Sequence, residues 1–185
     1  MKNVIINNHS FKIKISSAEI QKAVTDIAGA INHNLKDKNP LFLAVLNGSF
    51  MFAADLMRQI TIDCEISFVK LASYEGTTSS GKIKQLIGID ENVKGRTVVI
   101  IEDIVDTGNT IENIWEQLKG LGPAEIKIAT LLFKSDAFIK TVPVEYAAII
   151  VPNDFLVGYG MDYNGLGRNL NDIYVLDYVT DDKNK

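Results

Sequence analysis

The sequence contains a single cysteine, Cys64, among its 185 residues. One thiol excludes an internal disulfide, so we expect a protein of a reducing compartment, the cytoplasm. No apolar run approaches the ~18 residues of a membrane-spanning helix, and charge follows Met1 too soon for a signal peptide. Cysteine and histidine also lack the spacing of a zinc site.

The chain also lacks a strong charge of either sign. Its 19 basic and 23 acidic residues give a net charge of −4 at pH 7. Non-specific binding of nucleic acid needs a concentrated basic surface, so we expect no nucleic-acid partner, and without a spanning segment no membrane partner. Hydrophobic residues make up 46% and charged residues 23%, which is typical of one folded globular domain.

Apolar runs alternate with helical patterns along the chain, which indicates an α/β fold with a mostly parallel sheet. Two short strands are expected around Asn7 and Asn8. Ser16 and Glu19 have the capping-box pattern, which predicts a helix reaching about Lys36. Further strands are expected at 41–46, 62–71, 82–89, 97–101, 126–133 and 146–151, and helices at about 50–59 and 111–120.

The clearest functional signal follows the apolar run at 97–101. In a parallel α/β sheet, ligands bind outside the carboxyl ends of the strands. Glu102 and Asp103 end this strand, and such a pair suits sugar hydroxyls, which donate to it, or Mg²⁺, which neutralises it. Next comes a string that opens a helix and can cradle an anion with backbone N–H groups and hydroxyls, namely Asp106, Thr107, Gly108, Asn109 and Thr110.

A pair of acids that can bind the two hydroxyls of a diol, followed by a segment that can bind a phosphate, indicates a ribose 5-phosphate as the ligand. The simpler alternative is that Asp106 or Thr107 only caps a helix and that Glu102 and Asp103 are solvated. Other motifs fit worse: the sequence has neither the P-loop nor the dinucleotide fingerprint. An aspartyl-phosphate phosphatase needs two aspartates two positions apart, whereas Asp103 and Asp106 are three apart.

The string closely resembles the phosphoribosyl-pyrophosphate (PRPP) signature of type I phosphoribosyltransferases. Features over about 15–176 resemble the hypoxanthine-guanine branch of this family. The resemblance implies the type I phosphoribosyltransferase fold, a mostly parallel sheet flanked by helices with a small hood. We expect one domain over 1–185, with a core of about 37–150 and a hood built from about 1–15 and 151–180.

The activity implied by this resemblance is purine salvage. The 5-phosphoribosyl group would pass from PRPP to N9 of hypoxanthine or guanine, giving IMP or GMP and pyrophosphate, with Mg²⁺ as cofactor. Relatives are homodimers or homotetramers. Two alternatives stay open: a PRPP-binding regulator of the same fold, and a xanthine-preferring transferase, because hypoxanthine, guanine and xanthine differ only at C2.

The resemblance also implies roles for single residues. Asp106 would lie near purine N7 and accept a proton or share one during transfer, and residues 106–110 would form the 5-phosphate loop. Asn109 occupies a position that is often lysine in relatives. Glu102 and Asp103 would lie near the ribose hydroxyls and their Mg²⁺.

The purine would be held from two segments. Lys134 would meet the oxygen at purine C6, because an ammonium group donates to a 6-oxo group but not to the 6-amino group of adenine. The hood segment, residues 151–164, would bind the base through stacking on Phe155, the Leu156 backbone, and Asp162, which would reach a second metal ion. Arg168 would bind pyrophosphate oxygens with its forked donors.

Two loops complete the implied site. Residues Asn47, Gly48 and Ser49 resemble the pyrophosphate loop, although relatives carry lysine or arginine where this chain has Asn47. Contacts would then come from backbone N–H groups and Ser49, and the Leu46–Asn47 peptide is expected to be cis. Ser73 and Tyr74 resemble the start of a lid that excludes water from an oxocarbenium-like state.

Overall fold

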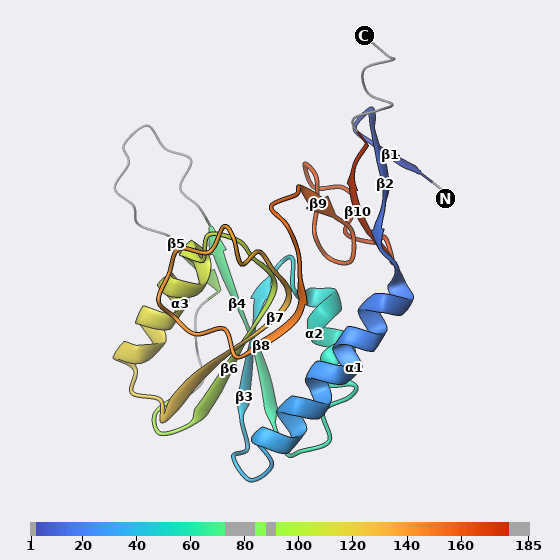
Figure 1. Cartoon of the computed structure of the whole chain (residues 1–185). Coiled ribbons are helices and arrows are strands. Elements are labelled where there is room, and N and C mark those ends of the chain that lie inside the picture. The colour runs from blue at the N-terminus through green and yellow to red at the C-terminus, as the bar shows by residue number, and fades with distance from the viewer. Residues whose placement is uncertain (1–2, 73–83, 88–91, 178–185) are drawn as a thin grey trace.

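The computed structural model of the chain describes residues 3–72, 84–87 and 92–177. Strands and helices alternate through most of the sequence (Figure 1). In chain order they are β1 (Val4–Ile6), β2 (His9–Ile15), α1 (Ser17–Asn34), β3 (Leu41–Leu46), α2 (Phe50–Met57), β4 (Glu65–Ala72), β5 (Lys84–Ile87), β6 (Thr97–Val105), α3 (Asn109–Gly120), β7 (Glu125–Phe133), β8 (Tyr146–Ile150), β9 (Leu156–Val157) and β10 (Ile173–Leu176).

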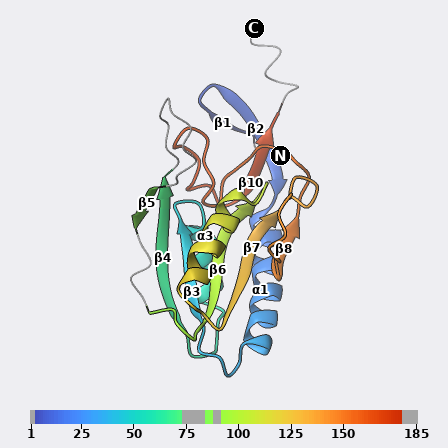
Figure 2. The same cartoon turned by 90° about the vertical axis from the view of Figure 1, so that its left-hand side faces the viewer.

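The core is a six-stranded sheet with the order β5-β4-β3-β6-β7-β8. Strands β4, β3, β6, β7 and β8 run parallel to one another. Strand β5 pairs antiparallel with β4 at the edge of the sheet. Helices α1 and α2 cover one face and α3 covers the other (Figures 1 and 2). The expected α/β fold with a mostly parallel sheet is therefore confirmed. No helix in the described ranges is long and apolar enough to span a bilayer.

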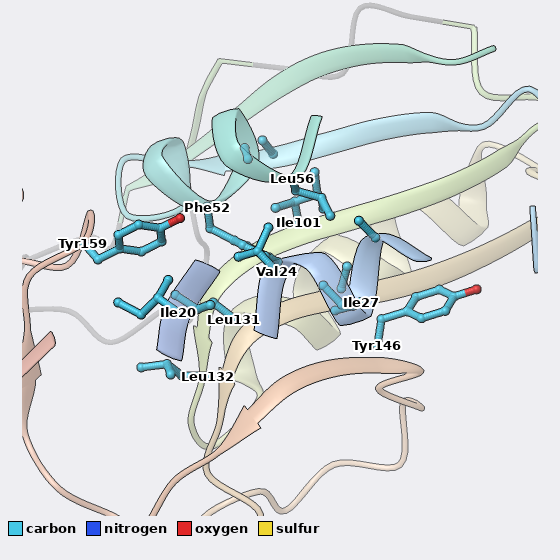
Figure 3. Close-up of a cluster of buried hydrophobic side chains, with 14 of the residues drawn as sticks. Ile20, Val24, Ile27, Phe52, Leu56, Ile101, Leu131, Leu132, Tyr146 and Tyr159 are labelled. Carbon is cyan, nitrogen blue, oxygen red and sulfur yellow. The ribbon is translucent and has the colours of Figure 1, made fainter. Parts of the chain in front are cut away.

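Each face of the sheet has its own buried cluster. On one face, Ile20 and Val24 of α1 pack with Phe52 of α2 and with Ile101 of the sheet (Figure 3). On the other face, the apolar stripe of α3 packs on the sheet through Ile111, Ile114 and Leu118. Residues of β6 alternate between the clusters, as expected for a strand covered on both faces.

The local signals at the N-terminal end formed the expected structures. Asn7 and Asn8 have φ of 48° and 64°, the left-handed pair that a type I′ hairpin turn requires. The Ser16 hydroxyl accepts from the Glu19 N–H, and the Glu19 carboxylate accepts from the Ser16 N–H at 2.9 Å. Helices α1 and α2 each end two residues before the expected Lys36 and Gln59.

A second sheet, with the order β1-β2-β10-β9, joins both ends of the described chain. It lies beyond the end of the core to which the arrowhead of β4 points (Figures 1 and 2). We call these four strands the hood sheet. Strands β9 and β10 were not expected from the sequence, because strands of 2 and 4 residues are too short to show a period.

Several expected boundaries differ by a few residues, among them the start of β4, and the one that matters for the site is the end of β6. Strand β6 does not end at Glu102 and Asp103 but continues to Val105, and it stays paired with β7 up to Val105 opposite Phe133. The ladder hydrogen bonds therefore hold both acids inside the sheet rather than in a solvated loop.

Candidate active site

A first cavity of about 240 Å³ lies between the carboxyl ends of β6 and β7 and the hood segment. Parallel strands end at the same edge of the sheet, and the hood segment reaches this edge after β8. The cavity therefore brings together side chains that are distant in sequence. Its lining consists of Asp103, Ile104, Asp106, Lys134, Phe155, Leu156, Met161 and Asp162.

A second cavity of about 80 Å³ adjoins the first and is lined by residues 104–111. Ile104 and Asp106 line both cavities. The second cavity lies at the beginning of α3. The backbone N–H groups there have no partner within the helix and favour an anion. Thr107, Gly108, Asn109 and Thr110, the predicted phosphate cradle, all line this cavity.

Gly108 cannot carry a side chain at this turn. Its φ is +87°, and an added Cβ would lie 2.5 Å from Phe138 and 2.7 Å from Lys140. The Lys140 ammonium pairs with Glu112 in the first turn of α3, at 2.7 Å. The turn that opens α3 is therefore closed on one side by the segment that follows β7.

Lys134 is buried and lines the first cavity. Its Nζ lies 2.8 Å from Asp106 Oδ2 and 3.1 Å from Asn153 Oδ1. Only 7% of Lys134 is exposed, whereas Asp106 is half-exposed, so Lys134 is not a solvated side chain at a strand end. The sequence analysis assigned no role to Asn153, although a polar residue soon after β8 was a usable signal.

The two adjacent acids are both buried. Burial raises the pKa of Glu102 well above its usual value, and the neighbouring Asp103 raises it further. One carboxylate oxygen of Glu102, Oε2, is buried with no hydrogen-bond partner. Burial also raises the pKa of Asp103 to about 6, against backbone hydrogen bonds and the nearby Arg168, which lower it.

The carboxylates near the first cavity suit a metal ion whose remaining ligands come from the substrate. Within the described part of the chain, no three Asp, Glu, His or Cys side chains converge as a ready-made metal site. Asp103 and Asp162 nevertheless line one cavity, and Glu102 holds an unpartnered oxygen, although it does not line that cavity. Mg²⁺ is typically held by one or two carboxylates together with substrate phosphates, so this donor set suits it.

The loop of residues 47–49 lies directly against Asp103. The Leu46–Asn47 peptide is cis, as expected. A Cβ added to Gly48 would collide with the Asp103 carboxylate, and one added to Gly160 would collide with the Gly48 carbonyl oxygen. The loop, the buried acid and the hood segment therefore meet at one point.

Ser49 does not present its hydroxyl to this point. The side chain is fully buried, and Oγ donates to the Val45 carbonyl oxygen at 2.6 Å. In this structure the Ser49 hydroxyl is therefore bonded to the backbone of β3 and is not exposed at the predicted pyrophosphate site, whose contact through Ser49 stays a prediction. The bonded hydroxyl shapes the entry into α2.

The remaining predicted residues lie in or beside the hood segment. Phe155 lines the first cavity and is half-exposed, so it is not a core residue. Its ring meets that of Tyr163 edge-on, with 5.5 Å between the ring centroids. Arg168 donates to the Gly160 carbonyl oxygen at 2.7 Å and pairs with Asp162 at 2.6 Å. Ser73 and Tyr74, the predicted start of the lid, lie outside the described residues.

Comparison with known proteins points to the same family. The family model described as "Phosphoribosyl transferase domain" matches residues 16–164. The hypoxanthine-guanine phosphoribosyltransferase of Lactococcus lactis subsp. lactis is 39% identical over 166 residues, which cover 89% of this chain and 90% of that protein. That of Streptococcus pneumoniae R6 is 36% identical over 173 residues, 93% of this chain and 96% of that protein.

A solved structure has the same fold. The crystal structure of a hypoxanthine-guanine phosphoribosyltransferase from Bacillus anthracis matches with a TM-score of 0.83 and 35% identity. The match covers 90% of this chain and 96% of that one. With most of its length matched in sequence and in structure, and with acids and an anion cradle at the end of β6, the chain belongs to the phosphoribosyltransferase family.

Proposed function

We propose that this protein is a hypoxanthine-guanine phosphoribosyltransferase of purine salvage. It would transfer the 5-phosphoribosyl group of PRPP to N9 of the base and release pyrophosphate, with IMP or GMP as the nucleotide product. The observation that carries the proposal is that the first and second cavities share Asp106. A base in the first cavity and a 5-phosphate in the second would therefore present the ribose carbon between them.

Each end of PRPP has a separate place in this arrangement. The 5-phosphate would bind the backbone N–H groups at the beginning of α3, with hydroxyls of Thr107 and Thr110 beside it. The pyrophosphate would lie along the loop of residues 47–49, near Arg168. Asn109 and Asn47 bring no charge to either end, so the N–H groups carry more of the binding here than they would beside a lysine.

The base would be recognised at three edges. Lys134, which Asp106 and Asn153 hold in place, would donate to the oxygen at C6. Asp106 would accept the N7 proton as N9, the nucleophilic nitrogen, bonds to the ribose carbon and pyrophosphate leaves, so that the nucleotide base stays neutral. Phe155 would stack on the ring, and the Leu156 backbone would bond the far edge. Holding the base and the anomeric carbon together in this way supplies most of the catalysis by positioning.

Mg²⁺ bound to PRPP would neutralise charge on the departing pyrophosphate. Asp103 and Asp162 would hold it from the first cavity, with Glu102 behind them. The hood sheet would cover the base, in a single domain divided into a core and a hood. We place the enzyme in the cytoplasm, because its one cysteine forms no internal disulfide, and expect a homodimer or homotetramer, as in the relatives.

A spectrophotometric assay tests this function. PRPP, MgCl₂ and one of four bases are incubated with the protein, and nucleotide formation is followed. Hypoxanthine or guanine should react and adenine should not, because a 6-amino group cannot accept from Lys134. A reaction with xanthine alone would favour the xanthine-preferring alternative. PRPP binding without turnover of any base would favour the regulator.

A further inference from the structure

Tyr159 connects the hood segment to the core of the molecule. It lies three positions before Asp162, yet only 2% of it is exposed. Its ring belongs to the buried cluster that contains Phe52 and Ile20 (Figure 3). The hydroxyl group donates to Asp55 Oδ2 of α2 at 2.6 Å.

Asp55 is itself held by two further groups. Gln21 of α1 donates to the same oxygen at 2.7 Å, and Arg58 pairs with the other oxygen at 2.8 Å. Burial raises the pKa of Tyr159, and the bond to Asp55 raises it further, so the hydroxyl group remains a donor. The bond therefore joins the hood segment to α1 and α2 at once.

The backbone around Tyr159 has an uncommon conformation. Tyr159 has φ of 48°, a left-handed conformation that residues other than glycine seldom adopt. Gly158 and Gly160 on either side have φ of +104° and +100°. The turn is tied to the chain beyond it, because the Tyr159 N–H donates to the Leu170 carbonyl at 2.8 Å and the Gly160 N–H to the Arg168 carbonyl at 2.9 Å.

This turn touches the catalytic region on two sides. Gly160 packs so closely on the Gly48 carbonyl oxygen that no side chain fits between them. The next residues, Met161 and Asp162, line the first cavity. Helix α2, which carries Asp55, begins directly after the loop of residues 47–49. Both ends of the Tyr159–Asp55 bond therefore lie a few residues from groups that would bind pyrophosphate and metal.

We infer that Tyr159 and Asp55 are positioning residues for phosphoribosyl transfer. Their hydrogen bond holds the hood turn at residues 158–162 against the loop of residues 47–49, and so sets the gap that receives the pyrophosphate end of PRPP. The inference rests on the proposed function. It concerns a contact behind the binding surface, because neither side chain lines the first or the second cavity.

A third cavity, of about 400 Å³, lies beside this bond, and Gln21, Asp55, Arg58 and Tyr159 line it. These four polar groups already bond to one another. We therefore assign the cluster to the anchor and no ligand to the cavity.

The test compares two tyrosine variants of the full chain. Tyr159→Phe removes only the hydroxyl group that bonds Asp55. Tyr174→Phe is the matched control, because Tyr174 is a buried hood residue with a longer bond of 3.4 Å to Asp172. For each protein, kcat, KM for PRPP, KM for hypoxanthine and the thermal midpoint are measured. We expect Tyr159→Phe to raise KM for PRPP at least fivefold with KM for hypoxanthine changed less than twofold, and the control to stay within twofold throughout.

Two variants of Asp55 separate positioning from folding. Asp55→Asn keeps an oxygen that accepts from Tyr159, so it should restore most of the PRPP affinity that Asp55→Ala loses. The inference is overturned if Tyr159→Phe behaves as the control does, or if both KM values rise together with the loss of thermal stability. An inactive wild-type protein would overturn the proposed function and this inference with it, whereas an active wild type with an unchanged Tyr159→Phe variant overturns the inference alone.

Discussion

Lys134 and Asp106 form an ion pair at the end of two neighbouring parallel strands, with 2.8 Å between Nζ and Oδ2. The lysine follows β7 directly and the aspartate follows β6, so the sheet register brings them together. Lys134 is buried and also bonds Asn153 of the hood segment. Two groups with different proposed roles, at purine C6 and at purine N7, are therefore held by one contact.

Replacing Asp106 by asparagine should reduce turnover strongly. Asparagine keeps the size and an oxygen for Lys134 but cannot take a proton at purine N7. Because the phosphate cradle uses backbone N–H groups, the affinity for PRPP should stay within several-fold of the wild type. Steady-state kinetics with hypoxanthine and direct PRPP binding give the two values. Near-normal turnover would contradict the role of Asp106.

Replacing Lys134 by alanine should raise KM for hypoxanthine far more than KM for PRPP. The variant loses the donor to the 6-oxo group, which costs about 1–3 kcal/mol when the partner is left unpaired, or roughly 5- to 150-fold in affinity. Lys127→Ala is the matched control, because Lys127 lies on the same strand and pairs with Glu125 and Glu145. Equal effects on both KM values would exclude the base contact.

Replacing Gly48 by alanine should impair PRPP binding, because the added methyl group would displace the Asp103 carboxylate. We expect kcat/KM for PRPP to fall by about tenfold or more, with about 1–3 kcal/mol of stability lost to the clash. Gly29→Ala is the control: Gly29 lies inside α1 with no atom near its Cβ position, so alanine should stabilise the fold by about 0.5–1 kcal/mol. Kinetics and urea unfolding distinguish the two, and an active, stable Gly48→Ala would disprove the close contact.

The stability of the ligand-free protein should depend on pH through the titration of Asp103. Its pKa is about 6 in the folded state, above the usual 3.8, so between these values the folded chain binds more protons than the unfolded chain. Stability should then fall as pH rises from about 4 to 6, by on the order of 3 kcal/mol for this one group. The raised pKa of Glu102 acts in the same direction.

Asp103→Asn removes this titration. The free energy of unfolding of the variant, relative to the wild type, should therefore increase from pH 4 to pH 7 in urea denaturation without ligand. Asp37→Asn changes an exposed acid and serves as the control. A difference between Asp103→Asn and wild type that is constant over this pH range would show that burial does not raise the pKa of Asp103 in solution.

Much of the fold and part of the site could be predicted, because their signals are contiguous. The capping box at Ser16, the apolar run of β6 and the string at residues 106–110 each lie within a few positions, and each formed the expected local structure. Lys134 and Phe155 came from resemblance, and the sheet then brought them to one cavity with Asp106.

The contacts that sequence reasoning missed join residues far apart in the chain. The bond between Tyr159 and Asp55 spans 104 positions in the sequence, and the bond between Lys134 and Asn153 spans 19. No local sequence pattern predicts either contact. The Ser49 hydroxyl was assigned to the pyrophosphate because Asn47 stands where relatives carry lysine or arginine, but here the hydroxyl is buried against the Val45 carbonyl. Such outcomes depend on tertiary packing.

The most direct test of the account is product stoichiometry with hypoxanthine, PRPP and MgCl₂. Each hypoxanthine consumed should give one IMP and one pyrophosphate, with formation of both slowed together in Asp106→Asn. Pyrophosphate released without IMP, or PRPP bound with neither product formed, would contradict the central claim that this site transfers the phosphoribosyl group to a 6-oxopurine.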